Sequence, residues 1–127
     1  MKNKLNAVNE FHETFKVGSA AKEPSLLSAE EAQLRYKLLR EENEEYLEAC
    51  QNDDLIEIAD ALGDQLYILC GTILKHGLQE KIEEVFEEIH RSNMSKLDEN
   101  GQPIFREDGK VMKGKGYFRP NIKKILG

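Results

Sequence analysis

Residues 55–76 read LIEIADALGDQLYILCGTILKH, and this stretch decides the fold. Its apolar side chains fall on nearly every side of the helix that the pattern predicts, and such a helix is buried. Glu57 and Asp60 nevertheless lie three residues apart within it, on one face. Buried carboxylates are costly unless something compensates their charge, and a divalent cation held by oxygen ligands does so. The stretch therefore predicts a buried helix that carries a Mg²⁺ or Mn²⁺ site.

A second acidic set lies on the preceding helix, which is predicted over residues 28–51. The set has the pattern E-E-x-x-E and consists of Glu41, Glu42 and Glu45. On its own, such a run is more typical of a solvated helix surface. A short turn at residues 52–54 makes the two helices antiparallel neighbours, so Glu45 and Asp60 should lie at nearly the same height. The pairing predicts that both acidic sets face one site.

The rest of the chain completes an all-α fold. Apolar periodicity predicts three further helical segments, at residues 4–16, about 79–91 and 122–126. The dipeptide Asp108-Gly109 predicts a short hairpin between them. We predict one domain over residues 1–127, a four-helix bundle with a helical core at about 4–92 and a basic tail at about 93–127. A short chain cannot easily cover its apolar helix alone, so we expect a homo-oligomer, either a dimer or a dimer of dimers.

The charge is distributed unevenly along the chain. The net charge of the 127 residues is -6, with 11 basic and 22 acidic residues before position 106 and 7 basic and 2 acidic residues from there on. The acidic body argues against nucleic-acid binding. The basic tail favours a small anionic ligand or an acidic docking surface.

Targeting and redox features suggest a cytoplasmic protein. No apolar run reaches the roughly 18 residues that a membrane span needs. The polar start, residues 1–10, lacks the apolar segment of a signal peptide. Cys50 and Cys70 fall inside helical patterns, and their spacing matches no metal site or disulfide framework. We interpret them as reduced thiols in a cytoplasmic protein that has no membrane partner.

The motifs resemble those of the all-α nucleoside triphosphate pyrophosphohydrolases, a MazG-like group that includes phosphoribosyl-ATP pyrophosphohydrolases and dimeric dUTPases. The resemblance rests on the two acidic sets and extends over most of the chain after about Phe11. It includes four further segments: ADALGDQLY at 59–67, HRSNMSKL at 90–97, GKVMKG at 109–114 and YFRP at 117–120.

The resemblance implies a fold, a reaction and a role for individual residues. It implies a helical bundle completed by a second subunit, and hydrolysis between the α and β phosphates that gives a nucleoside monophosphate and pyrophosphate. The implied Mg²⁺ ligands are Glu42, Glu45, Glu57 and Asp60. Glu41 would assist Glu42 and Glu45 in catalysis, at an additional metal or by orienting the attacking water, and Asp64 would support the ligands from behind. Asn93 and Lys96 would contact the base, sugar or phosphates.

The basic tail allows two interpretations. Lys110, Lys113 and Arg119 lie near Gly114 and Gly116, which is typical of a mobile phosphate-binding lid, but a solvated tail explains any one of these cations equally well.

Other functions also stay open. Glu87 and His90 form an E-x-x-H pattern, and ferritin-like di-iron bundles carry two such patterns. A non-enzymatic helical interaction protein is the remaining alternative. If the chain is an enzyme, no residue pattern in the sequence indicates which base it recognises, so the nucleotide is undetermined. Phosphoribosyl-ATP and non-canonical nucleotides, removed by a house-cleaning enzyme, are both candidates.

Overall fold

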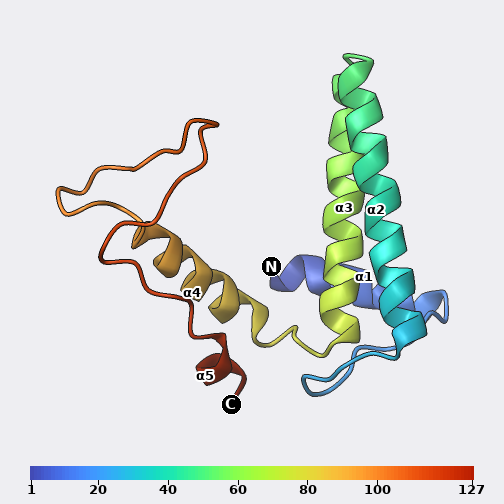
Figure 1. Ribbon diagram of the computed structural model, residues 1–127. Coiled ribbons are helices and arrows are strands. Elements are labelled where there is room, and N and C mark those ends of the chain that lie inside the picture. The colour runs from blue at the N-terminus through green and yellow to red at the C-terminus, as the bar shows by residue number, and fades with distance from the viewer. The chain divides into compact units, whose positions relative to one another are not determined.

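The computed structural model describes residues 1–127 and is all-α, as predicted (Figure 1). Its five helices are α1 (Lys2–Thr14), α2 (Ala29–Gln51), α3 (Leu55–Lys75), α4 (Ile82–Met94) and α5 (Ile122–Leu126). None of these helices is both long and apolar enough to cross a membrane. The chain divides into two compact units, residues 1–80 with α1 to α3 and residues 81–127 with α4 and α5. That the whole chain acts as one domain stays a prediction.

In the first unit, α2 and α3 form a long antiparallel pair, and α1 packs against α3 (Figure 1). Side-chain caps begin both long helices: Ser28 Oγ accepts a hydrogen bond from Glu31 N at 3.1 Å, and Asp54 Oδ1 accepts one from Glu57 N at 3.2 Å. The link between the helices turns sharply because Asp53 adopts a left-handed conformation, with φ of 52°. These local signals determine where the pair folds back on itself.

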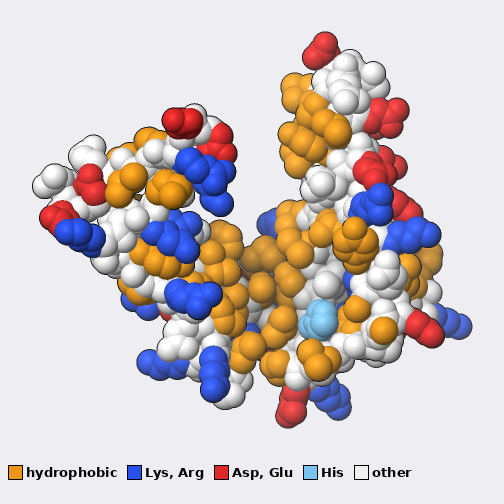
Figure 2. Space-filling view, viewed as in Figure 1, with side chains coloured by type: hydrophobic (Ala, Val, Ile, Leu, Met, Phe, Trp, Pro, Cys, Tyr) orange, Lys and Arg blue, Asp and Glu red, His pale blue; other side chains and the backbone are white.

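The apolar surface of α3 is only partly covered. Side chains with little exposure form the core of the first unit: Leu5, Val8, Ala49, Ala61, Cys70, Ile73 and Leu74. In contrast, Leu55 is 76%, Ile56 81% and Leu62 51% exposed. Figure 2 shows hydrophobic side chains on the surface of this helical pair. Within the first unit, the prediction that α3 is buried nearly all round is therefore wrong, because only α1 and α2 of that unit pack against it.

Gly71 allows a close contact between the three helices of the first unit. Arg35 reaches from α2 to α3, where Nη2 donates to Ile68 O at 2.8 Å and Nε donates to Thr72 Oγ1 at 3.0 Å. A Cβ at Gly71 would lie 2.5 Å from Arg35 Nη2 and 3.0 Å from Nε2 of the buried His12. The glycine thus leaves room for the end of the Arg35 side chain and for His12, whereas a Cβ at Gly63 would meet nothing within 4 Å.

The second unit contains the predicted hairpin. Phe105 and Val111 form an antiparallel bridge, which is flanked by hydrogen bonds from Arg106 N to Lys110 O and from Met112 N to Ile104 O, each 2.7 Å long. Gly109, with φ of 87°, makes the turn. The turn dipeptide therefore predicted this hairpin correctly. The segment after the hairpin returns along α4 and ends in α5.

Candidate functional site

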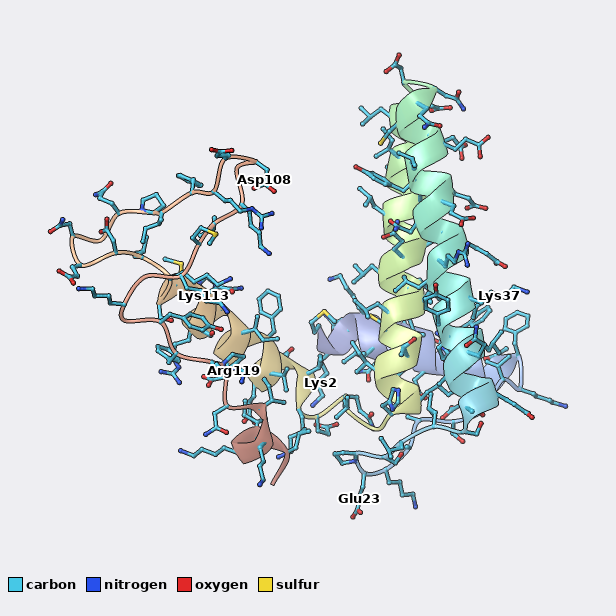
Figure 3. The ribbon with its side chains drawn as sticks, in the orientation of Figure 1. Lys2, Glu23, Lys37, Asp108, Lys113 and Arg119 are labelled. Atoms are coloured by element: carbon cyan, nitrogen blue, oxygen red, sulfur yellow. The ribbon has the colours of Figure 1, made fainter.

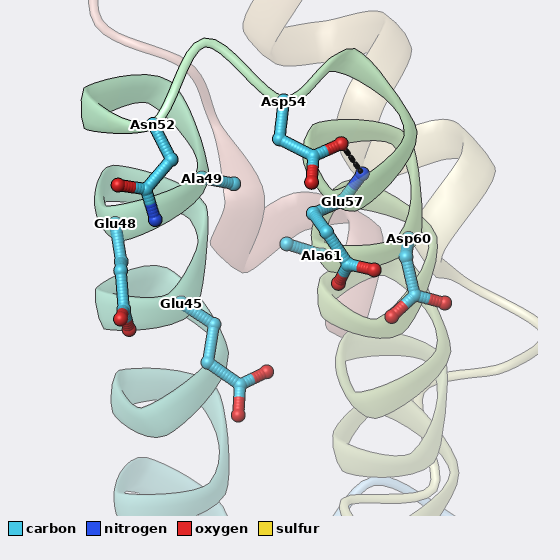
Figure 4. Close-up of a pocket in the computed structure, with 8 residues that line it drawn as sticks. All are labelled: Glu45, Glu48, Ala49, Asn52, Asp54, Glu57, Asp60 and Ala61. Atoms are coloured by element: carbon cyan, nitrogen blue, oxygen red, sulfur yellow. Dashed lines mark hydrogen bonds between the residues drawn. The ribbon is translucent and has the colours of Figure 1, made fainter.

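An acidic cleft of about 340 Å³ lies between α2 and α3 near their link (Figure 4). Its lining residues are Glu45, Glu48, Ala49, Asn52, Asp54, Glu57, Asp60 and Ala61. Glu45 extends from α2 toward α3, and Glu57 and Asp60 come from the facing helix. The structure thus brings three of the four predicted metal ligands to one cleft. Their convergence follows from the register of the antiparallel pair, which the short link determines.

Glu42, the fourth predicted ligand, adjoins this group on α2. Its side chain is half-buried, and its Oε2 is fully buried with no hydrogen-bond partner. Burial is the main cause that raises the pKa of Glu42 from 4.5 to about 7, and a hydrogen bond with Glu45 and the negative charges of Glu45, Asp64 and Asp60 add to it. The shift therefore reflects burial first and the neighbouring carboxylates second.

The other predicted acids differ in their positions. Asp64 lies close enough to Glu42 for its charge to raise the pKa of Glu42, and its supporting role stays a prediction. Glu41 is exposed and does not line the cleft.

The sequence interpretation missed Glu48 and Asp54 as lining residues of the cleft. Glu48 follows Glu45 by three residues, so helical spacing could have identified it. From the sequence, residues 52–54 are interpreted only as the turn between the two helices. Asp54 caps α3, with Oδ1 engaged by the backbone N–H of Glu57, and it lines the cleft as well.

The donor set of this cleft fits a hard divalent cation. No three acidic, histidine or cysteine side chains converge closely enough here to form a complete metal site. The available donors are nevertheless carboxylate oxygens, together with the amide of Asn52, and Mg²⁺ and Mn²⁺ prefer such oxygen ligands. The buried Glu42 Oε2 lacks any hydrogen-bond donor, and a cation would satisfy it.

The second unit holds the predicted nucleotide-binding residues. Asn93 is exposed on the last turn of α4, and Lys96 follows that helix, with its carbonyl accepting a hydrogen bond from Gly114 N at 2.8 Å. Lys113 Nζ lies 4.8 Å from the ring centroid of Tyr117. Lys110 and Arg119 are exposed. Glu87 and His90, the E-x-x-H pair, are exposed as well.

The pKa of Glu42 gives the metal-free protein a specific pH dependence. Because its pKa is raised to about 7 in the folded state, the unfolded state loses this proton first as pH rises. We therefore expect the Tm to fall between about pH 5 and about pH 8 in chelator, since the folded state binds more protons in that range. Thermal melts of the parent and of Glu42→Gln measure this contribution. An equal decrease of Tm with pH in the parent and in Glu42→Gln would contradict the assignment to Glu42. Added Mg²⁺ should restore the Tm at the high-pH end of this range.

Comparison with known proteins places these features in a family. The family described as phosphoribosyl-ATP pyrophosphohydrolase matches residues 8–93, which include both acidic sets. Among solved structures, the chain is similar to a protein of Exiguobacterium sp. 255-15 that is provisionally assigned as an NTP pyrophosphohydrolase. The identity is 26%, the alignment covers 95% of this chain and 90% of that chain, and the TM-score is 0.50. No match was found among curated proteins.

Proposed function

Because the chain belongs to the phosphoribosyl-ATP pyrophosphohydrolase family, and is thus a hydrolase of phosphoric anhydrides, we propose that it is a Mg²⁺-dependent nucleoside triphosphate pyrophosphohydrolase. It cleaves between the α and β phosphates and releases a nucleoside monophosphate and pyrophosphate. The observation that carries the proposal is the cleft between α2 and α3, where Glu45, Glu57 and Asp60 meet beside Glu42, whose pKa is raised.

The acidic residues have distinct proposed roles in this reaction. Glu42, Glu45, Glu57 and Asp60 would hold Mg²⁺, which when bound neutralises phosphate charge and acidifies a water molecule. Asp64 adds a negative charge beside the ligand set, which raises the pKa of Glu42 and which a bound cation would offset. Glu41 is exposed at the start of the same acidic set, so its carboxylate is free to orient the attacking water.

The metal also explains how an acidic cleft accepts a polyanionic substrate. Five of the eight lining residues are acidic, and without a cation they would repel a triphosphate. A bound cation reverses the local sign of the charge, as in other metal-dependent phosphate sites. Binding of the nucleotide and of the metal should therefore be coupled, each strengthening the other.

We propose a nucleoside triphosphate as the substrate class, in a house-cleaning role toward non-canonical nucleotides. The similarity to the Exiguobacterium protein supports this choice, whereas the description of the family favours phosphoribosyl-ATP as the second candidate. The interpretation as a ferritin-like or non-enzymatic helical protein is set aside, because the chain belongs to a family of hydrolases.

A substrate panel tests this proposal directly. The purified protein is incubated with Mg²⁺ and with standard and non-canonical nucleoside triphosphates or phosphoribosyl-ATP, and pyrophosphate release is measured. We expect turnover of at least one triphosphate, complete loss of activity in excess chelator, and recovery with Mg²⁺ or Mn²⁺. Turnover of phosphoribosyl-ATP alone would select the second candidate. Full turnover in chelator, or release of orthophosphate only, would contradict the proposed mechanism.

The exposed apolar side of α3 leads to a prediction about assembly. Leu55, Ile56 and Leu62 are all more than half exposed in a single chain, and burial of apolar surface drives association. We expect a symmetric dimer or a dimer of dimers at micromolar concentration. Light scattering that gives the monomer mass of 14.6 kDa would refute this expectation. Ile56→Asp should shift the equilibrium toward monomers, whereas Glu44→Gln, an exposed change on α2, should not.

A further inference from the structure

Ser92 in the last turn of α4 and Ser95, the residue that follows this helix, hold the backbone of Phe118. Ser92 Oγ donates a hydrogen bond to Phe118 O at 2.8 Å, and Phe118 N donates one to Ser95 Oγ at 3.2 Å. Ser92 is only 2% exposed, and Ser95 Oγ also donates to Ser92 O at 2.5 Å. Because the serines are three residues apart, they lie on one face of the helix. Both polar groups of one tail residue are therefore satisfied by α4.

Further contacts with α4 hold the ring of Phe118 and the backbone of Asn121. The guanidinium of Arg91 lies 4.4 Å from the ring centroid of Phe118, and Arg91 Nε donates to Glu88 Oε1 at 2.9 Å. Glu88 Oε2 accepts a hydrogen bond from Asn121 N at 2.7 Å. These contacts differ from the expected mobile lid, because the end of the basic segment is fixed to α4 rather than free.

The beginning of the segment is fixed to the end of α4. Gly114 N donates to Lys96 O at 2.8 Å, and a Cβ at position 114 would overlap the carbonyl of Leu97, so glycine is needed for this approach. Lys113 directly precedes this contact, and Arg119 directly follows Phe118. Figure 3 shows Lys113 and Arg119 beside α4. Residues 113–119 thus run next to the turn of the chain that carries Asn93 and Lys96.

We infer that Ser92 and Ser95 are positioning residues, which fix Arg119 near Asn93 and Lys96 through the backbone of Phe118. With Lys113, which the contact between Gly114 and Lys96 holds, Arg119 then forms a preformed cationic surface for a polyphosphate. This inference rests on the proposed function, because the pyrophosphate part of a nucleotide is the ligand. Cations that are already held in place lose less freedom when they bind an anion than cations on a mobile chain. The hydroxyl groups would act through the cations and would not touch the phosphates.

A double-mutant cycle on pyrophosphate binding tests the inference. Pyrophosphate is titrated calorimetrically into the full chain in chelator, so that only the cations bind it. We expect Arg119→Ala to weaken binding about tenfold, which is the loss of one charge-assisted contact. Ser95→Ala should weaken pyrophosphate binding by several-fold. Ser95→Thr, which keeps the hydroxyl, should bind pyrophosphate as tightly as the parent. The double variant Ser95→Ala/Arg119→Ala should bind no more weakly than Arg119→Ala alone.

Additive losses in the double variant, or unchanged binding in Ser95→Ala, would overturn the inference. A geometric readout accompanies the cycle: trypsin should cut after Lys113 and Lys115 faster in Ser92→Ala and Ser95→Ala than in the parent, while cleavage after Lys22 in the first unit stays constant. Equal rates of cleavage after Lys113 and Lys115 in the parent and in both serine variants would also overturn the inference. If the cycle holds but no triphosphate of the panel is hydrolysed, only the proposed reaction fails.

Discussion

Glu57→Gln is expected to reduce kcat on the order of a thousandfold without unfolding the protein. The neutral amide keeps the size of the side chain but removes a charged metal ligand, and metal coordination contributes several kcal/mol to the stabilisation of such transition states. A loss of about 4 kcal/mol corresponds to about three decades in rate. The cap of α3 should survive, because Asp54 bonds to the backbone of Glu57 and not to its side chain. Steady-state pyrophosphate release measures the effect.

Stability without metal provides an independent check of this variant. Removing one negative charge from the cleft relieves repulsion, so the Tm in chelator should not fall. The rise in Tm that Mg²⁺ causes in the parent should, however, disappear. Glu44→Gln is the matched control, because Glu44 is an exposed partner of Arg40 on α2 and does not line the cleft. Parent-like turnover in Glu57→Gln would remove this residue from the metal site.

Arg119→Ala and Lys113→Ala should each lower kcat/KM by roughly ten- to a hundredfold. Charge-assisted hydrogen bonds to phosphate contribute roughly 1.5–3 kcal/mol each, which corresponds to such factors. Metal binding without nucleotide should stay nearly constant, because cationic side chains do not ligate a cation. Steady-state kinetics and metal titrations separate the two effects.

The matched control for the tail is Lys115→Ala. Lys115 is exposed and pairs with Glu99 at 3.2 Å, and we expect its removal to change kcat/KM little. Equal losses in all three variants would indicate a general effect of charge rather than specific contacts. Unchanged kinetics in Arg119→Ala and Lys113→Ala would leave the tail as a solvated segment and return phosphate binding to Lys96 and the metal.

The helices and the centre of the site could be predicted because their signals are local. Ser28 and Asp54 mark the starts of α2 and α3, and both act as side-chain caps in the structure. The positions of Glu45 and Asp60 relative to the short link were enough to predict that they meet, and both line the cleft. Periodicity also predicted an apolar α3, but not which of its sides a single chain covers. Which sides of α3 are covered depends on the helices that pack against it, and in the first unit these are α1 and α2.

The remaining features depend on contacts between residues far apart in the sequence. The raised pKa of Glu42 needs the charges of Asp60 and Asp64, which only the folded pair brings near it. The bond between Ser92 and Phe118 joins residues 26 positions apart, and serine spacing on α4 gives no sign of it. Two glycines in the basic tail suggested mobility, although Gly114 instead permits a close backbone contact.

The left-handed turn at Asp53 has a consequence for how this sequence can diverge. Asp53 is one of only three residues in the link between the two carboxylate-bearing helices, and glycine would adopt its φ of 52° more easily. The residue at position 53 can therefore be replaced by another residue that adopts this φ, such as glycine. The length of the link is more constrained, because the short link sets the register in which Glu57 and Asp60 of α3 lie opposite Glu45 of α2. Related enzymes can thus differ in composition here, whereas insertions and deletions should be confined to the loops elsewhere.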